Sequence, residues 1–192
     1  RNVDVTTERE PISAEAPGIN AVPANAQFLG ELAPYEKGGD DNRRLGFEGH
    51  GVLNDPADID VYSFRADGGT EVWLDIDQTS IALDSVVELV DANGIVIARS
   101  DESYNEQIGL EEVFGIGQSM DRSVFNGKDR YTVNLHDAGM RVVLPGAAGT
   151  TNTYHVRVRS SNADVANNIS GGITSGAYQL QIRLQEMDEV PG

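Results

Sequence analysis

The chain has 192 residues, enough for one domain with a substantial core, and its 31 acidic residues outnumber 14 basic ones, giving a formal net charge of −17. Phosphate binding needs a basic face, so this charge argues against nucleic acids and anionic membrane surfaces as partners, and it favours cation binding. The sequence contains no cysteine, which excludes disulfides, thiolate metal sites and cysteine nucleophiles. It also contains no run of about 18 apolar residues, so we expect no membrane insertion.

Short alternating apolar and polar runs, separated by Gly, Asn and Asp, predict an all-β protein. Residues 1–27 are polar and are interpreted as an N-terminal segment or linker, in which Val3 and Val5 predict a short edge strand. A loop over 33–44 follows, and then a glycine-rich strand over 47–53.

A polar turn at 54–58 leads into the clearest strand of the chain, which begins near residue 60. Asn, Asp and Pro supply the backbone angles that a chain reversal needs. Asp55, Asp58 and Asp60 bring three carboxylates close together, which is costly unless water or a cation screens them. Oxygen ligands at such a junction suit Ca²⁺. The alternative interpretation is a solvated acidic turn that holds no ion.

The next strand, over 70–77, alternates between apolar residues on one face and acidic residues on the other. Trp73 falls among the acidic residues, so it is either a contact residue at the surface or packs on a neighbouring loop. Residues 84–90 and 95–99 predict a hairpin, because Asn93-Gly94 lies between two apolar runs.

The region 102–130 shows no clear pattern and is interpreted as a long excursion of the chain. The remaining strands are predicted over 131–135 and 140–144, which would pair with each other, and over 154–159 and 176–184.

These strands and the absence of a confident helix predict a jelly-roll-like antiparallel β-sandwich with a long insertion. We place the sandwich at 28–185, with the insertion at about 103–149 and a C-terminal linker at 186–192. Because the sequence starts at Arg1 and closes on a linker-like stretch, we expect it to be a piece of a longer polypeptide.

Five elements occur in the order typical of one family: a D-x-D strand, a glycine turn with its strand (Gly68-Gly69 and 72–74), a hairpin and two closing strands. The sequence Asp58-Ile59-Asp60-Val61-Tyr62-Ser63-Phe64 resembles the D-x-D-x-Y-x-F strand of the bacterial pre-peptidase C-terminal (PPC) domain. Residues 89–101 are similar to the hairpin of that family, and 154–158 with 175–180 resemble its closing strands. The resemblance covers about residues 15–102 and 150–185.

The resemblance implies a small β-sandwich appended to secreted enzymes and surface proteins. Related collagen-binding modules of clostridial collagenases bind Ca²⁺ through an acidic N-terminal segment and the D-x-D turn. By position, this implies Glu15 and Asn20 as ligands from the N-terminal segment, and Asp58 and Asp60 from the turn. Asp55 is a neighbour of the turn without a confident counterpart.

The sequence offers no constellation for an enzyme. Its three histidines lie in separate segments, so a zinc site is not expected, and no Gly-x-Ser-x-Gly nucleophile elbow is present.

We therefore expect a non-catalytic, extracellular or cell-surface bacterial module that binds Ca²⁺ and serves adhesion, targeting or assembly. Its partners would be other domains of the parent polypeptide, an extracellular protein or polysaccharide, or copies of itself. Two alternatives remain open: a structural subunit of a surface layer or filament, and a carbohydrate- or protein-binding module. The binding module would present exposed aromatic residues on one sheet, with Trp73, Tyr62, Tyr154 and Tyr178 as candidates.

Overall fold

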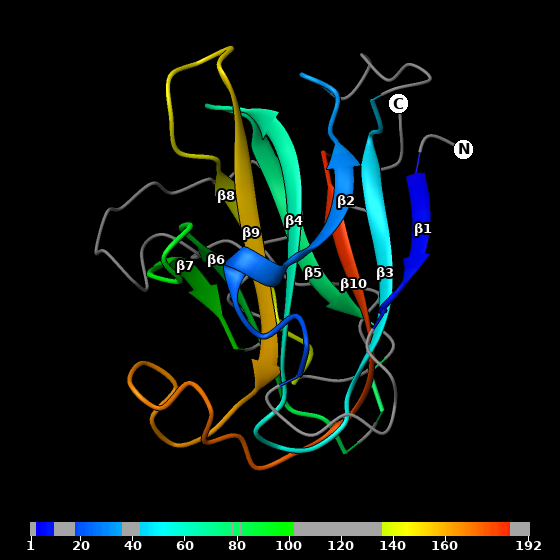
Figure 1. Ribbon diagram of the computed structural model, residues 1–192, viewed down its shortest axis with the longest axis vertical. Coiled ribbons are helices and arrows are strands. Elements are labelled where there is room, and N and C mark those ends of the chain that lie inside the picture. The colour runs from blue at the N-terminus through cyan, green and yellow to red at the C-terminus, as the bar shows by residue number, and fades with distance from the viewer. Residues whose placement is uncertain are drawn as a thin grey trace, which may run out of the picture.

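The computed structural model describes residues 3–9, 18–35, 43–77, 79–80, 82–101 and 136–184. These residues form ten strands in two five-stranded sheets, which confirms the predicted β-sandwich (Figure 1). The strands are β1 (Val3–Thr7), β2 (Gln27–Glu31), β3 (Gly46–Leu53), β4 (Ile59–Asp67), β5 (Glu71–Asp77), β6 (Ser85–Val90), β7 (Val96–Ser100), β8 (Gly139–Val143), β9 (Thr151–Ser160) and β10 (Gly176–Arg183), and one short 3₁₀ turn, η1 (Pro23–Asn25), precedes β2.

The two sheets have the strand orders β1-β3-β10-β5-β8, here called sheet A, and β2-β4-β9-β6-β7, here called sheet B. Every step along the chain from one strand to the next crosses between the sheets, except the β6–β7 hairpin. This alternation is the connection pattern that a jelly-roll-like sandwich predicts. It also means that most strand pairs join residues far apart in the sequence.

The pairing is antiparallel with two exceptions. β1 runs parallel to β3, and β2 runs parallel to β4. Both exceptions come from the N-terminal part of the chain and lie at sheet edges. A two-residue hairpin forces an antiparallel pair, whereas these strands reach their partners by longer connections that allow either direction.

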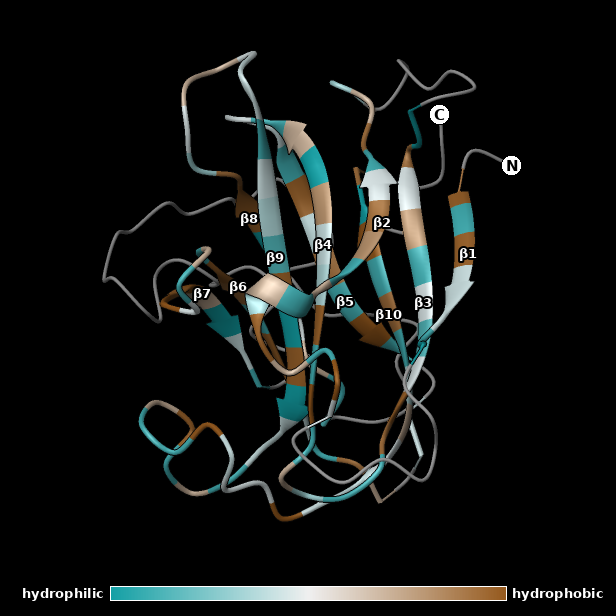
Figure 2. Ribbon diagram, in the orientation of Figure 1, coloured by the Kyte–Doolittle hydropathy of each residue, from teal (hydrophilic) through white to brown (hydrophobic). Residues whose placement is uncertain are grey.

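One apolar core fills the space between the sheets, and apolar and polar residues alternate along the strands that face it (Figure 2). The predicted alternation of 70–77 is confirmed, because Val72, Leu74 and Ile76 are buried in this core. The core also includes Tyr62, Tyr154 and Tyr178. These three tyrosines therefore do not form the exposed aromatic cluster that a binding module of the predicted kind would show.

Trp73 lies on the opposite face of β5, the outer face of sheet A, and is only 4% exposed. The guanidinium carbon of Arg141, on the neighbouring strand β8, lies 5.3 Å from the centroid of its ring. Trp73 is thus covered by a strand neighbour and is not a surface contact residue.

The predicted hairpin is confirmed as β6 and β7, and Gly94 adopts a φ of 82° in its turn. The strand predicted over 140–144 is confirmed as β8, which contributes Met140 and Val142 to the core, so this part of the predicted insertion at about 103–149 belongs to the sandwich. β8 pairs with β5, and the strand predicted over 131–135 lies outside the described residues. Among the described residues, no helix is long and apolar enough to cross a membrane.

Candidate functional site

The turn before β4 uses its carboxylates to bind its own backbone. Both oxygens of Asp58, which is 1% exposed, accept backbone N–H groups, at 2.7 Å from Asn54 and 2.9 Å from Ile59. Asp55 is exposed, and its Oδ1 accepts the N–H of Ala57 at 2.7 Å. These are the local hydrogen bonds that Asp makes in turns, and they account for both residues without a ligand.

Asp60 is placed differently from its two neighbours, because its side chain points into the sandwich and is fully buried. Its Oδ2 accepts the hydroxyl of Tyr178 at 2.6 Å, and the Tyr178 oxygen lies 2.8 Å from that of Tyr62. Since Tyr178 donates its only proton to Asp60, Tyr62 is the donor in the second bond. The other carboxylate oxygen of Asp60, Oδ1, is buried and has no hydrogen-bond partner.

Glu8, which follows β1, brings a second carboxyl group to Asp60. One of its oxygens, Oε2, accepts the N–H of Val52 at 2.9 Å, whereas Oε1 is buried without a partner. The side chain and the charge of Glu8 both raise the pKa of Asp60, so the two carboxyl groups influence each other. Two carboxylates cannot hydrogen-bond to each other unless they share a proton, so in this dry site they need a proton or a cation between them.

Asn20 adds further unpaired polar atoms beside the same strand. Its backbone carbonyl accepts the N–H of Val61, the residue after Asp60, at 2.9 Å. Its side chain is 6% exposed, and neither its Oδ1 nor its Nδ2 has a partner. Buried amides without hydrogen bonds are uncommon and costly, so each such atom calls for an explanation.

Only some of the predicted ligands therefore have oxygens that lack a hydrogen-bond partner. Asn20 and Asp60 have buried oxygens without partners, whereas the oxygens of Asp58 and one oxygen of Asp55 are held by backbone groups. Glu15 lies outside the described residues. Glu8 was not predicted as a ligand, and its local sequence does not indicate it, because the pairing of β1 with β3 and the packing of the two sheets place it.

Burial is the main cause of an unusual protonation state at this site. It raises the pKa of Asp60 to about 10, with further contributions from the hydrogen bond and charge of Glu8. The hydrogen bond from Tyr178 lowers this pKa and the charge of Asp58 raises it, and both effects are smaller than those of burial and of Glu8. At neutral pH, in the absence of a cation, Asp60 is thus protonated. Over the described ranges, no group of three or more His, Asp and Glu side chains is arranged to hold a metal ion.

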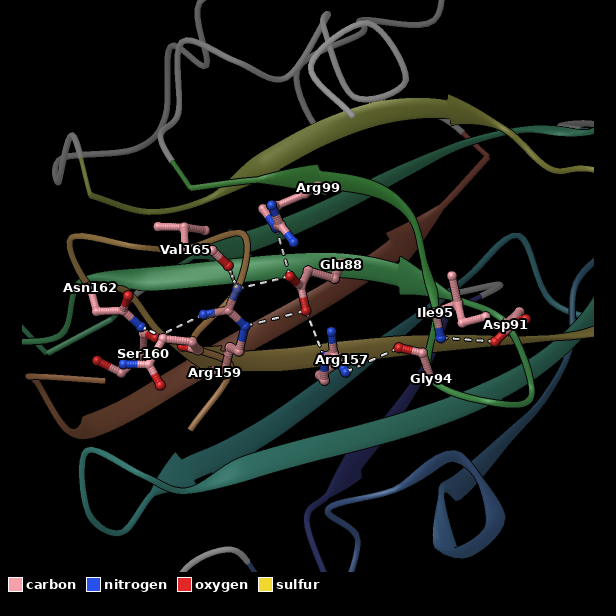
Figure 3. A network of polar contacts seen from close by, with 11 residues as sticks. Glu88, Asp91, Gly94, Ile95, Arg99, Arg157, Arg159, Ser160, Asn162 and Val165 are labelled. Carbon is pink, nitrogen blue, oxygen red and sulfur yellow. Dashed lines mark hydrogen bonds and ion pairs between the residues drawn. The ribbon is translucent and has the colours of Figure 1, made fainter. Parts of the chain in front are cut away.

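A second buried polar cluster lies on the outer face of sheet B (Figure 3). Glu88 is fully buried, and its carboxylate binds Arg99 at 2.7 Å, Arg157 at 2.5 Å and Arg159 at 2.9 Å. Arg159 also donates to the carbonyl of Val165 at 2.6 Å. The cluster thus ties β6, β7 and β9 to the loop that follows β9.

The positive charges of this cluster keep the buried Glu88 ionised, which is typical of a structural ion-pair network. Burial alone would raise the pKa of Glu88, but the hydrogen bonds and charges of Arg159, with Arg157 and Arg99, outweigh it and lower this pKa to about 2. The sequence contained a signal for the cluster, because one Glu interrupts an apolar strand, and two Arg residues alternate with apolar residues in another. This local signal does not identify Glu88 as the partner of Arg157 and Arg159, because the pairing of β6 with β9 joins residues far apart in the sequence.

No protein-family model matches the sequence, and a comparison with curated proteins likewise finds no match.

Proposed function

We propose that this protein is a non-catalytic β-sandwich module of a larger bacterial surface or secreted protein, and that a Ca²⁺ ion bound between its N-terminal segment and β4 stabilises it. One observation carries the proposal: buried oxygens of Glu8, Asn20 and Asp60 have no hydrogen-bond partner. The resemblance of residues 58–64 to the D-x-D strand of PPC domains supports the module assignment.

The side chains of Glu8, Asn20 and Asp60 supply part of the oxygen ligand set that a hard cation needs. Carboxylate and amide oxygens are the ligands that Ca²⁺ prefers, and the acidic balance of the chain favours cation binding. Glu8 and Asp60 would supply carboxylate oxygens and Asn20 an amide oxygen. The cation would replace the proton that the two carboxyl groups otherwise share, so binding would release a proton.

Such an ion would hold the N-terminal segment against the sandwich. Glu8 follows β1, an edge strand of sheet A, whereas Asp60 is the second residue of β4, which lies next to the edge strand of sheet B, so an ion between them would bridge the two sheets. Binding would add about 3 to 4 kcal/mol to the free energy of unfolding when the free ion is 100 to 1,000 times its dissociation constant. This stability would suit a module that works outside the cell without disulfides.

The test compares thermal melts of the full chain in Ca²⁺ and in EGTA. We expect Ca²⁺ to raise the melting temperature of the parent by several degrees. Asp60→Asn removes the charge that the cation needs, so this variant should show no response to Ca²⁺. In EGTA it should be more stable than the parent at pH 7 by about 1 to 3 kcal/mol, because the parent must keep a proton on Asp60.

The matched control is Asp55→Asn, which removes an exposed acid from the same turn. This variant should keep the full response to Ca²⁺. Superimposed melts of the parent in Ca²⁺ and EGTA would refute the ion site. The β-sandwich would stand in that case, and the Glu8–Asp60 pair would be a proton-sharing pair only.

A further inference from the structure

Residues 3–9 are attached to the rest of the protein as an extended peptide is attached to its binding site. This segment, here called the N-terminal arm, contains β1 and lies along one edge of the sandwich beside β3 (Figure 1). None of the five β1 residues is buried, and none belongs to the apolar core. The arm is therefore held by backbone and polar contacts, and its departure would leave the core closed.

Backbone pairing holds the arm along β3. The five residues of β1 pair in parallel with residues 46–50, and the N–H of Glu8 donates to the carbonyl of His50 at 2.8 Å. The N–H of Val52 donates to Oε2 of Glu8 at 2.9 Å. Without the arm, β3 would be the edge strand of sheet A. Addition of an extended segment to an open sheet edge is a recurring mode of peptide recognition.

Gln27 on β2 gives this edge a specific contact with the arm. Its buried side chain donates through Nε2 to Oγ1 of Thr6 at 3.3 Å and to the carbonyl of Thr7 at 3.1 Å. Its Oε1 accepts the N–H of Arg9 at 2.9 Å. Because β2 belongs to sheet B and β3 to sheet A, the arm is held by both sheets at once.

The occupant that this site fits is the arm of any copy of this chain. The contacts with Gln27 and β3 join the arm to the body of the protein, and a second copy offers the same atoms in the same order. Exchange between two copies therefore keeps each of these hydrogen bonds and changes only the connection. Residues 10–17 form that connection, and a chain from Arg9 to Gly18 spans at most about 30 Å.

Both sides of this connection lie at one end of the sandwich. Glu8 contacts Val52 near the end of β3, and the carbonyl of Asn20 accepts the N–H of Val61 near the start of β4. β3 leads into β4 through the turn at 54–58, so these two places are at the same end. Two copies that face each other through this end can each place an arm on the other, which gives a closed two-fold dimer.

The charge of the chain does not prevent such pairing. Each copy carries a net charge of −17, so two copies repel each other at low salt. At about 0.15 M salt, charges further apart than about 8 Å are largely screened. At the contact itself, Nε of Arg44 binds Oδ1 of Asp4 at 2.8 Å, so the arm brings an acid to a basic partner.

We propose that two copies of this chain exchange their N-terminal arms, so that each lays its β1 on β3 of the other. Gln27 and the N–H of Val52 then bind the arm of the second copy through the same hydrogen bonds that they form within one chain. The exchange does not rest on the Ca²⁺ proposal, because these contacts need no ion.

Two single-cysteine variants test the exchange, because the chain has no cysteine of its own. Val5→Cys and Glu48→Cys place thiols at partner positions of β1 and β3. Neighbouring strands lie about 4.8 Å apart, so a short bismaleimide can join the two thiols. The variants are unfolded together in urea, refolded in EGTA over a range of protein concentrations, and then cross-linked. Since each chain carries one thiol, a link between positions 5 and 48 joins two chains.

The matched control replaces Glu48→Cys with Ile95→Cys. Ile95 is 65% exposed and lies in the β6–β7 hairpin, whereas β1 lies at the opposite edge of the sandwich. Mass spectrometry of the linked peptides measures both yields. We expect the 5–48 link to exceed the 5–95 link at least tenfold and to increase with protein concentration. Equal yields of the two links would overturn the proposal.

A peptide with the sequence of residues 1–9 provides a second measurement, which does not depend on further variants of the full chain. Excess peptide present during refolding should occupy β3 and lower the yield of the 5–48 link severalfold. The same peptide with Glu8→Ala lacks the carboxylate that binds the N–H of Val52, so it should be less effective. No effect of the parent peptide, or equal effects of the two peptides, would overturn this mode of docking.

Discussion

At the scale of single residues, Glu88 and Asp60, two of the buried acids of this protein, have opposite protonation states because their partners differ. Glu88 is surrounded by three guanidinium groups and stays ionised. Asp60 meets a tyrosine hydroxyl and a second carboxyl group, and burial raises its pKa to about 10. Burial disfavours the charged form in both cases, and only opposite charges of sufficient number reverse the outcome.

Replacement of Glu88 by Gln should be among the most damaging single changes in this protein. It would leave three buried or nearly buried guanidinium groups without a counter-charge, which costs about 3 to 5 kcal/mol when a buried ion pair loses one partner. Urea unfolding at pH 7 measures the loss. Glu31→Gln is a suitable control, because its ion pairs with Arg43 and Arg65 are more exposed and should be worth less than about 1 kcal/mol. Equal losses in the two variants would contradict this account of Glu88.

At the scale of elements, the β6–β7 hairpin is set by its own turn. Oδ1 of Asp91 accepts the backbone N–H groups of Asn93 and Ile95, both at 2.8 Å. Gly94 closes the turn with a φ of 82°, a conformation that residues with a Cβ atom seldom adopt. The turn therefore depends on backbone conformation and not on packing.

Gly94→Ala should destabilise the protein by about 1 to 2 kcal/mol through backbone strain alone. An added Cβ atom would come no closer than 3.9 Å to its nearest neighbours, Arg157 and Pro23, so no steric clash contributes. Gly94→Asn should cost less, because Asn tolerates this region of φ. Denaturant unfolding of both variants checks the order, and a larger loss for Asn than for Ala would show that the side chain, not φ, decides.

β1 is the least buried strand of the fold, since none of its five residues is buried. Its attachment relies on the parallel pairing with β3 and on polar ties such as that from Gln27, whose Nε2 donates to the Thr7 carbonyl at 3.1 Å. Deletion of residues 1–9 should therefore leave a folded sandwich. It should abolish the response of the melting temperature to Ca²⁺, because Glu8 is removed. A truncated protein that still responds to Ca²⁺ would place the ion elsewhere.

At the scale of the whole molecule, Glu88 and Asp60 give stability a defined dependence on pH. The pKa of Glu88 is lowered from 4.5 to about 2, so its contribution is present above about pH 4.5 and is lost as the pH falls towards 2. This shift corresponds to about 3 kcal/mol. The pKa of Asp60 is raised from 3.8 to about 10, so its contribution is present below about pH 3.8 and is lost as the pH rises towards 10.

From these two acids we expect the parent in EGTA to be most stable near pH 4 to 5. Saturating Ca²⁺ should move the maximum to higher pH, because the ion takes the place of the Asp60 proton. Melting temperatures measured from pH 3 to 9 with and without Ca²⁺ would show the shift. Two profiles of the same shape would contradict the cation site, and a flat acid limb in Glu88→Gln would confirm the assignment of the acid transition to Glu88.

The features that the sequence determined by itself are those that a few neighbouring residues control. Alternation of apolar and polar residues places strand faces without any knowledge of the partner strand, which is why the inward face of β5 was predicted. The Asn93-Gly94 turn defines its hairpin for the same reason. Together, such local signals were sufficient for the all-β class and the sandwich.

Tertiary structure alone decided the features that depend on long-range pairing. The register of β1 on β3 places Glu8 beside Val52, and that of β6 on β9 brings Glu88 to Arg157 and Arg159. The parallel direction of β1 and β2 was likewise not encoded in any turn. Charge state follows burial and neighbours, and both arise only when the sheets close on each other. The acids at 55–60 therefore have two different roles: Asp55 and Asp58 accept backbone N–H groups in the turn, whereas Asp60 is a buried carboxyl whose pKa is raised.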